Sequence, residues 1–397
     1  MVNKVFAFLL KSVLVIFILG FLFILSGTLF PFVPYVSVGN LLFELVLRAT
    51  TFIWVSILLF AISAFAFKKL GGTVLKICTA LGLVLVIGFF SINLSQYMTA
   101  RKHDVNISLT KLTGISPPLT YDDIQTGDFV YSNVDGPKEL TVYTPNSTSA
   151  AGHPVILYIH GGGWTTGDRH NASSFLKEFA NAGYVAISIS YSLATATKAT
   201  WDIAPKQINE ALSWINTHAA DYQMDLDRFY MFGESAGGQL VTNTANRIND
   251  GTIEKELNEK VPTVKAVSVA VPAVNPKALY ETTKLPVFKQ NLYTLVTSYL
   301  GKDGINNPEV FNSVSSFETI SSKTPPTFIL GGAHDHIVPP SIVEDYYKQL
   351  KAAGIDTEYI KLPFADHATN TVYPNGVGYE MLSQLTLRWF NKYGSGI

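Results

Sequence analysis

Two glycine-rich segments of this chain carry residue types that suit acyl-transfer chemistry. Residues 160–164 read His-Gly-Gly-Gly-Trp, and residues 233–238 read Gly-Glu-Ser-Ala-Gly-Gly. Each follows an apolar run that predicts a buried strand. The second segment fits the Gly-x-Ser-x-Gly turn, in which glycines permit a strained strand-to-helix connection that exposes the hydroxyl of Ser235. The first can aim backbone N–H groups at a developing oxyanion, so the pair predicts a serine nucleophile beside an oxyanion-binding loop.

A serine nucleophile needs a base, and the base needs an orienting carboxylate. In a strand–turn–helix architecture of this kind both follow later strands, in the chain order Ser, Asp, His. The predicted strand Thr327–Leu330 is followed by Asp335, and the predicted strand Glu358–Leu362 is followed by His367. The predicted catalytic set is therefore Ser235, Asp335 and His367.

Neighbouring residues offer alternatives to this set. His334 and His336 flank Asp335 and resemble part of a metal site, but no cysteine or carboxylate cluster elsewhere completes a ligand set. Asp366 precedes His367 and competes for the role of orienting acid, yet an adjacent loop residue rarely reaches the ring of its neighbour. We therefore expect no metal, no organic cofactor, and Asp335 as the acid.

Two further ionisable residues lie inside the motifs. His160 is expected to shape the glycine loop through a hydrogen bond of its ring rather than to act as a base. Glu234 occupies the variable position of the serine turn and is expected to make structural hydrogen bonds beneath the nucleophile.

The first hundred residues differ sharply in composition from the rest. Three uncharged apolar runs, Ser12–Phe30, Ala49–Phe67 and Ile77–Leu94, each have about the length that crosses a ~30 Å hydrocarbon core as a helix. A cleaved signal peptide is disfavoured for the first run because it is long and two more runs follow closely. The sequence predicts three transmembrane helices that interact with membrane lipid.

Basic residues predict the orientation of these helices. They flank the start of the first run and fill the connection between the second and third: Lys4, Lys11, Lys68, Lys69 and Lys76. Lys and Arg stay on the cytoplasmic side, so three spans would place everything after Leu94 outside the cell, or in the lumen in a eukaryote. Arg101 and Lys102, just beyond the third run, favour the opposite orientation.

The remaining sequence alternates predicted strands and amphipathic helices. This alternation predicts an α/β protein with a mostly parallel central sheet covered by helices on both faces. We expect a membrane anchor over residues 1–94, a linker or entry segment over 95–127, and a catalytic domain over 128–397, separable from its anchor. A net charge of −1 without a long basic run excludes nucleic acid as an expected partner, and the single cysteine, Cys78, excludes an internal disulfide. The oligomeric state is not predicted.

From about Thr141 onwards the chain resembles an α/β-hydrolase of the hormone-sensitive-lipase-like carboxylesterase group. The resemblance rests on the two glycine-rich segments, on Tyr-Ser-Leu-Ala at 191–194, and on the later Asp and His. It implies hydrolysis of a small-molecule carboxylic ester, with oxyanion N–H groups from Gly162, Gly163 and Ala236. Gly161 remains a further candidate donor.

Some features depart from this group. Glu234 replaces the usual Asp and Ser192 the usual Arg, while residues 337–340 also resemble acetyl-xylan or feruloyl esterases and prolyl-oligopeptidase-like hydrolases. The long segment Asn275–Lys323 forms either a lid, together with Trp164 as a substrate-binding residue, or an ordinary pair of surface helices.

The sequence thus predicts a membrane-anchored serine esterase for short acyl groups. A peptidase, or an acyltransferase acting on envelope polysaccharide, would use the same triad. An inactive membrane scaffold is a third alternative, disfavoured because all three triad candidates are present. Hydrolysis of p-nitrophenyl esters of graded chain length would discriminate among these.

Overall fold

The computed structural model describes residues 2–31, 49–113, 120–282, 286–368 and 376–394, and also residues 33, 35, 36, 38, 39 and 42. The chain forms two compact units. The first comprises residues 1–118, 332–336 and 362–381, and the second comprises residues 119–331, 337–361 and 382–397. The segments 332–336 and 362–381, which lie far along the chain, therefore belong to the same unit as the apolar N-terminal region.

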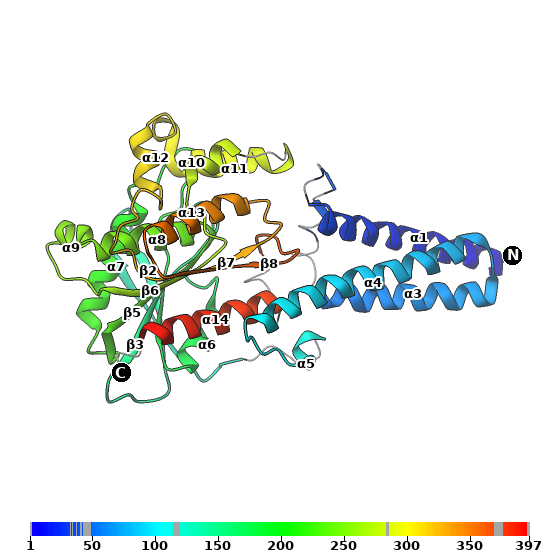
Figure 1. Ribbon diagram of the computed structural model, residues 1–397, viewed down its shortest axis with the longest axis horizontal. Helices are drawn as coiled ribbons and strands as arrows, with labels where there is room; N and C mark the ends of the chain where they lie inside the picture. Colours follow the sequence, from blue (N-terminus) through cyan, green and yellow to red (C-terminus); the bar gives the residue numbers. More distant parts are fainter. Residues whose placement is uncertain are drawn as a thin grey trace. The chain divides into compact units, whose positions relative to one another are not determined.

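Long apolar helices dominate the first unit (Figure 1). They are α1 (Val2–Leu29), α3 (Ala49–Leu70) and α4 (Thr73–Lys102), and a short helix α5 (Leu109–Leu112) follows. Each of the three is long and apolar enough to cross a membrane. Helix α4 continues to Lys102, past the predicted end at Leu94, so the beginning of the expected linker is helical.

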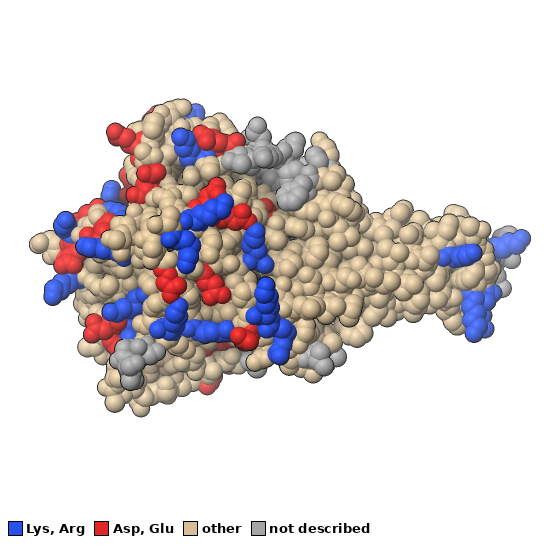
Figure 2. Space-filling model, viewed as in Figure 1, with Lys and Arg blue, Asp and Glu red and all other residues tan. Residues whose placement is uncertain are grey.

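These helices are apolar on both their inner and their outer sides. Phe52 and Phe89 are buried and their rings stack with centroids 5.1 Å apart, whereas Phe8 and Phe65 are exposed. A helix that is hydrophobic all round is typical of a membrane span. Figure 2 shows Lys and Arg side chains at one end of the helical region and an uncharged surface along the described part of it.

Close contact between α3 and α4 depends on a small residue. A Cβ added to Gly82 would lie 3.0 Å from the Cα of Phe60, so the two backbones approach as closely as in small-residue membrane interfaces. The buried hydroxyl of Ser56 donates to the carbonyl of Phe52 at 2.6 Å, which satisfies it within its own helix.

An eight-stranded sheet forms the centre of the second unit, in the order β1-β2-β4-β3-β5-β6-β7-β8. Its strands are β1 (Gln125–Ser132), β2 (Lys138–Thr144), β3 (His153–Ile159), β4 (Val185–Ile189), β5 (Met224–Glu234), β6 (Val264–Ala270), β7 (Thr327–Gly332) and β8 (Thr357–Leu362). Strands β4, β3, β5, β6 and β7 pair in parallel, while β2 pairs antiparallel with both β1 and β4. The predicted mostly parallel sheet is confirmed.

Helices cover both faces of the sheet (Figure 1). They are α6 (Ser173–Asn181), α7 (Ala204–His218), α8 (Ser235–Asn249), α9 (Thr252–Leu257), α10 (Pro276–Thr282), α11 (Pro286–Gly304), α12 (Pro308–Val314), α13 (Pro340–Ala352) and α14 (Val377–Gly394). The strands alternate between two apolar layers, as parallel strands buried on both faces do. Leu157 of β3 packs in the cluster that contains Leu212 of α7 and Val241 of α8, whereas Tyr158 points to the other face and stacks on Phe232.

The segment Asn275–Lys323, predicted to form either a lid or a pair of surface helices, is largely helical. It forms α10, α11 and α12, which Figure 1 shows gathered together. Residues 283–285 of this segment lie outside the described residues. Leu292, Val296, Tyr299 and Leu300 of α11 are buried, so this helix packs against the core of the second unit.

Candidate active site

Ser235 lies at a sharp turn where β5 ends at Glu234 and α8 begins. Its φ is 51°, a left-handed conformation that is uncommon for a residue with a side chain and typical of strained functional turns. A Cβ added to Gly237 would lie 2.1 Å from the carbonyl oxygen of Ile159, so only glycine lets the turn approach β3 this closely. The N–H of Ala236 belongs to the first turn of α8, whose amides have no partner within the helix.

The glycine loop lies beside this serine. A Cβ added to Gly161 would be 3.2 Å from the Cβ of Ser235 and 3.0 Å from the carbonyl oxygen of Glu234. The loop and the serine turn are therefore in direct contact within the second unit.

Hydrogen bonds to carbonyls fix the peptide planes of the loop. The ring of His160 bonds through Nδ1 to the carbonyl of Gly161 at 2.7 Å, and the N–H of Thr166 donates to the carbonyl of Gly162 at 3.0 Å. In a trans peptide the next N–H points away from the carbonyl before it. These bonds therefore set the directions of the N–H groups of Gly162 and Gly163, the two predicted oxyanion donors.

His160 itself is held by Tyr191. The two rings stack with centroids 4.3 Å apart, and the hydroxyl of Tyr191 donates to the carbonyl of His160 at 3.1 Å. Burial lowers the pKa of His160 below its ordinary value, which favours a neutral ring. The sequence analysis assigned no role to Tyr191. The Tyr-Ser-Leu-Ala segment, which begins with this residue, was the sequence signal that could have indicated one.

Trp164, the predicted substrate-binding residue, is 2% exposed. Its Nε1 donates to Oε1 of Gln239 on α8 at 3.0 Å, and its ring stacks on Tyr299 of α11 with centroids 4.5 Å apart. The indole thus joins the glycine loop to two helices instead of presenting its face to solvent. Gln239 was not predicted, because nothing local marks it as the partner of a residue so distant in sequence.

Glu234 accepts a hydrogen bond from the hydroxyl of Tyr158 at 2.8 Å. Burial of Tyr158, together with the charge of Glu234, raises the pKa of the phenol well above its ordinary value, so the hydroxyl remains a donor. Glu234 therefore has a structural partner on the neighbouring strand β3.

Asp335 and His367 lie together in the first unit. Nδ1 of His367 donates to Oδ2 of Asp335 at 2.8 Å, and Asp335 is 5% exposed. A carboxylate that accepts from Nδ1 holds the imidazole in the tautomer whose Nε2 is a proton acceptor. This is the state that a general base needs.

Asp366, the alternative acid, has a different partner. Its Oδ2 accepts from Nδ1 of His336 at 2.6 Å, and its Oδ1 accepts from the backbone N–H groups of His336 and His367, each at 2.9 Å. Asp366 is fully buried. It braces the loop that carries His367, while the ring of His367 contacts Asp335.

The histidines beside Asp335 are used for hydrogen bonds. Nδ1 of His334 contacts the carbonyl of Thr28 at 3.0 Å, and Nε2 of His336 contacts the carbonyl of Pro31 at 2.6 Å. Among the described residues no group of three or more His, Cys, Asp or Glu side chains is arranged to hold a metal ion.

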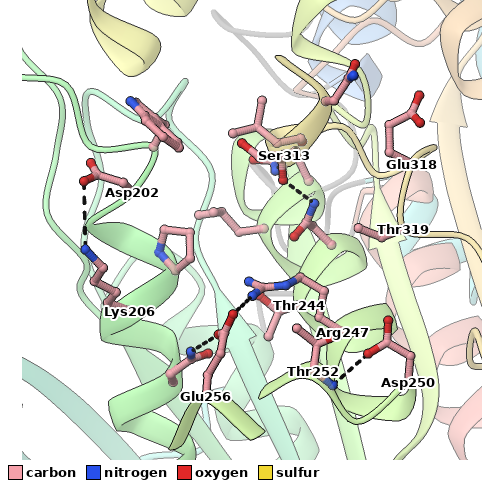
Figure 3. Close-up of a pocket in the computed structure, with 18 of the residues that line it drawn as sticks. Asp202, Lys206, Thr244, Arg247, Asp250, Thr252, Glu256, Ser313, Glu318 and Thr319 are labelled. Atoms are coloured by element: carbon pink, nitrogen blue, oxygen red, sulfur yellow. Dashed lines mark hydrogen bonds and ion pairs between the residues drawn. The ribbon is translucent and has the colours of Figure 1, made fainter. Parts of the chain in front are cut away.

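A hollow of about 1030 Å³ lies between α7, α8, α9 and α12 (Figure 3). Its two basic side chains each pair with an acidic one. Lys206 lies 3.9 Å from Asp202, and Arg247 bonds to Glu256. Ser235 does not line it. This hollow therefore lacks the chemistry of the candidate site.

Comparisons with known proteins identify the family of this chain. Residues 140–350 match the BD-FAE family. The esterase LipQ of Mycobacterium tuberculosis is 27% identical over 265 residues, which cover 66% of this chain and 61% of LipQ. The probable carboxylic ester hydrolase LipM of the same organism is 28% identical over 255 residues, which cover 62% of this chain and 57% of LipM. The match thus spans about three-fifths of the length of these relatives.

Solved structures share the fold. The bacterial heroin esterase superimposes with a TM-score of 0.58 at 22% identity, over 69% of this chain and 86% of that one. An esterase of Pyrobaculum calidifontis gives 0.55 at 21% identity, over 76% and 91% of the respective chains. Because the family match covers more than half of the chain and the sheet and its helices agree with these structures, the protein belongs to the BD-FAE family and has the α/β-hydrolase fold that its motifs resemble.

Proposed function

We propose that this protein is a membrane-anchored carboxylic ester hydrolase with Ser235 as its nucleophile. The observation that carries the proposal is the strained turn at Ser235, with φ of 51°, in contact with a glycine loop whose peptide planes are fixed. A serine hydroxyl next to preset amide donors is the arrangement that acyl transfer requires. Its relatives LipQ and LipM are named as an esterase and a probable carboxylic ester hydrolase.

His367 is proposed as the base and Asp335 as its orienting acid. Strands β5 and β7 belong to the parallel part of one sheet, and the residues that follow such strands meet at the same edge. Ser235 follows β5 and Asp335 follows β7, while His367 bonds to Asp335. Topology and the Asp335–His367 hydrogen bond therefore support a common site for the three residues.

The proposed reaction has two steps. Oγ of Ser235 attacks the ester carbonyl while its proton passes to Nε2 of His367, and the oxyanion is bound by the N–H groups of Gly162, Gly163 and Ala236. Each such donor stabilises the transition state by about 3 kcal/mol in related chemistry. The alcohol leaves with the proton from His367, and a water molecule activated by the same ring hydrolyses the acyl-enzyme.

Short acyl groups, from acetyl to butyryl, are the proposed substrates. A Cβ added to Gly163 would lie 2.8 Å from Cδ1 of Leu295, so this α11 side chain occupies space beside the proposed oxyanion donors. Leu295→Ala should therefore move the preferred p-nitrophenyl ester to a longer chain, while Leu292→Ala, a buried control on the same helix, should not. Highest activity of the wild type on long-chain triglyceride emulsions would contradict the proposal.

The catalytic part is proposed to face the cell exterior, or the lumen in a eukaryote. The support is the distribution of lysines over a three-span anchor: Lys68 and Lys69 lie in the last turn of α3, and Lys4 lies near the start of α1. There the enzyme would act on envelope or environmental esters.

The decisive test uses Ser235→Ala in the full chain, in detergent or nanodiscs. The variant should retain the thermal transition of the wild type and lose nearly all esterase activity and all labelling by an organophosphonate. Labelling of the variant at the wild-type rate would refute the assignment.

A further inference from the structure

The loops that carry Asp335 and His367 contact the ends of the apolar helices. All of these residues belong to the first unit, in which α1, α3 and α4 pack together with residues 332–336 and 362–381. The sequence predicted a linker between anchor and catalytic domain, so contacts of this kind were not expected.

The end of α1 offers acceptors that the helix itself cannot satisfy. Helix α1 ends at Leu29, and the last four carbonyls of a helix have no intrahelical partner. The carbonyl of Thr28, in this last turn, accepts from Nδ1 of His334 at 3.0 Å. The carbonyl of Pro31, just beyond the helix, accepts from Nε2 of His336 at 2.6 Å. The two histidines that flank Asp335 are thus both bonded to the end of the first apolar helix.

His336 connects this helix end to the histidine loop. Its Nδ1 faces the carboxylate of Asp366 at 2.6 Å and its Nε2 faces the Pro31 carbonyl, so both nitrogens meet acceptors and both must carry hydrogen. Burial acts to lower the pKa of His336, but the hydrogen bond and charge of Asp366 outweigh it and the pKa is raised. The resulting cation is also favoured by the negative end of the helix dipole of α1.

The histidine loop has its own contacts with the anchor. Nε2 of Gln96, near the end of α4, donates to the carbonyl of Pro363 at 2.9 Å. Phe364 packs against the apolar core of the helices and meets the ring of His334 edge to face at 5.4 Å. Its φ of 59° is strained for a bulky residue, and such strain persists only where surrounding contacts hold it.

From these contacts we infer that the membrane anchor positions the acid–base pair of the active site. His334 and His336 on one loop, and Phe364 on the other, hold Asp335 and His367 against α1 and α4, and Gln96 holds the second loop from the anchor side. They are positioning residues, because none is proposed to touch the reacting atoms. The inference rests on the proposed function, since it assumes that Asp335 and His367 serve Ser235.

The expected consequence is kinetic. Loosening the two loops would let the imidazole of His367 drift from the hydroxyl that it must deprotonate, and a displacement of about 1 Å can cost on the order of 100-fold in rate. A group that acts only in the transition state lowers kcat without changing KM. Binding of the ester should therefore be nearly unaffected.

The experiment compares full-length variants in lipid nanodiscs. Gln96→Met removes the donor from the anchor side with little change of shape, and Thr79→Val, which removes an intrahelical bond to Leu75 in the same helix, is its control. His336→Gln breaks the bridge between loops and anchor. Its control is His218→Gln on α7, whose Nδ1 likewise contacts a backbone carbonyl, that of Trp214, at 2.8 Å. The readouts are kcat, KM, the rate of organophosphonate labelling and Tm.

We expect kcat and the labelling rate of Gln96→Met and His336→Gln to fall about 10- to 100-fold, with KM within about twofold of wild type. The Tm of Gln96→Met should stay close to that of Thr79→Val. His336→Gln also loses the stability of its pairing with Asp366, so its kinetics are compared with those of His218→Gln at a temperature at which both are folded. If both retain kcat within about twofold of their controls, or if the activity lost by Gln96→Met merely follows a loss of Tm, the inference is wrong. Should His336→Gln not fold, Gln96→Met decides alone. Activity and labelling that survive in Ser235→Ala would instead refute the proposed function, so the two failures are distinguishable.

Discussion

Gly162→Ala tests whether the glycine loop binds the oxyanion. Gly162 has φ of 106°, and a Cβ there would lie 2.1 Å from the carbonyl oxygen of Thr166 and 2.8 Å from its Oγ1. Relief of this overlap requires the loop to move by about 1 Å, because ordinary contacts between such atoms begin near 3.5 Å. The same movement would break the bonds that orient the Gly163 amide.

The expected loss follows from this displacement. One misplaced oxyanion donor lowers kcat by about 10²–10³-fold, and the positive φ costs about 1–3 kcal/mol of folding stability. Gly183→Ala separates the two effects, because Gly183 has φ of 95° with nothing within 4 Å of an added Cβ. Both variants should therefore lose stability, and only Gly162→Ala should lose kcat.

The assay measures p-nitrophenyl acetate hydrolysis and urea or thermal unfolding of both variants in the same detergent. The substrate is small, so KM should change little. Equal kcat in the two variants, with equal loss of stability, would show that the Gly162 amide plane has no part in catalysis and would refute the oxyanion assignment.

Three further outcomes are expected. Asp335→Asn should lower kcat by about 10³–10⁴-fold, because an amide that donates to Nδ1 of His367 imposes the tautomer without a free Nε2 lone pair; kcat within tenfold of wild type would contradict the pairing. The pKa of His336 is raised from 6.5, so the stability that its pairing with Asp366 contributes should be present below about pH 6.5 and lost as pH rises through the folded-state pKa. The Tm difference between wild type and His336→Gln should therefore shrink as pH rises. A Tm difference that grows with pH would be inconsistent with a buried imidazolium. Protease added to intact cells should remove a C-terminal epitope tag, and removal only after permeabilisation would place the catalytic part in the cytoplasm.

Local sequence determined the elements whose geometry depends on a few consecutive residues. The turn at Ser235 and the loop at 160–164 need glycine because a Cβ at Gly237 or Gly162 would overlap a carbonyl oxygen at 2.1 Å. Because each of these glycines belongs to a short glycine-rich segment, the requirement for it is visible in the sequence as a motif. The alternation of buried strands and amphipathic helices likewise predicted the parallel sheet, and apolar length alone predicted three membrane-spanning candidates, although α4 extends beyond its predicted end.

Tertiary structure decided which distant side chains meet. Asp366 is next to His367 in sequence, and Asp335 was predicted to be its partner. Only the fold shows that the ring of His367 pairs with Asp335, whereas Asp366 pairs with His336. Trp164 reads as a candidate pocket residue, yet its burial depends on Gln239 and on the ring of Tyr299, which no local pattern connects to it.

The contacts between the apolar helices and the loops that carry Asp335 and His367 show this most clearly. The carbonyls of Thr28 and Pro31 are backbone groups with no sequence signature, and their partners His334 and His336 lie 306 and 305 residues away along the chain. A helix end leaves carbonyls unsatisfied whatever its sequence, but which donor reaches them depends on how the helices pack against the loops. Composition could therefore predict the apolar helices, whereas their contact with the loops of Asp335 and His367 emerged only from the three-dimensional arrangement.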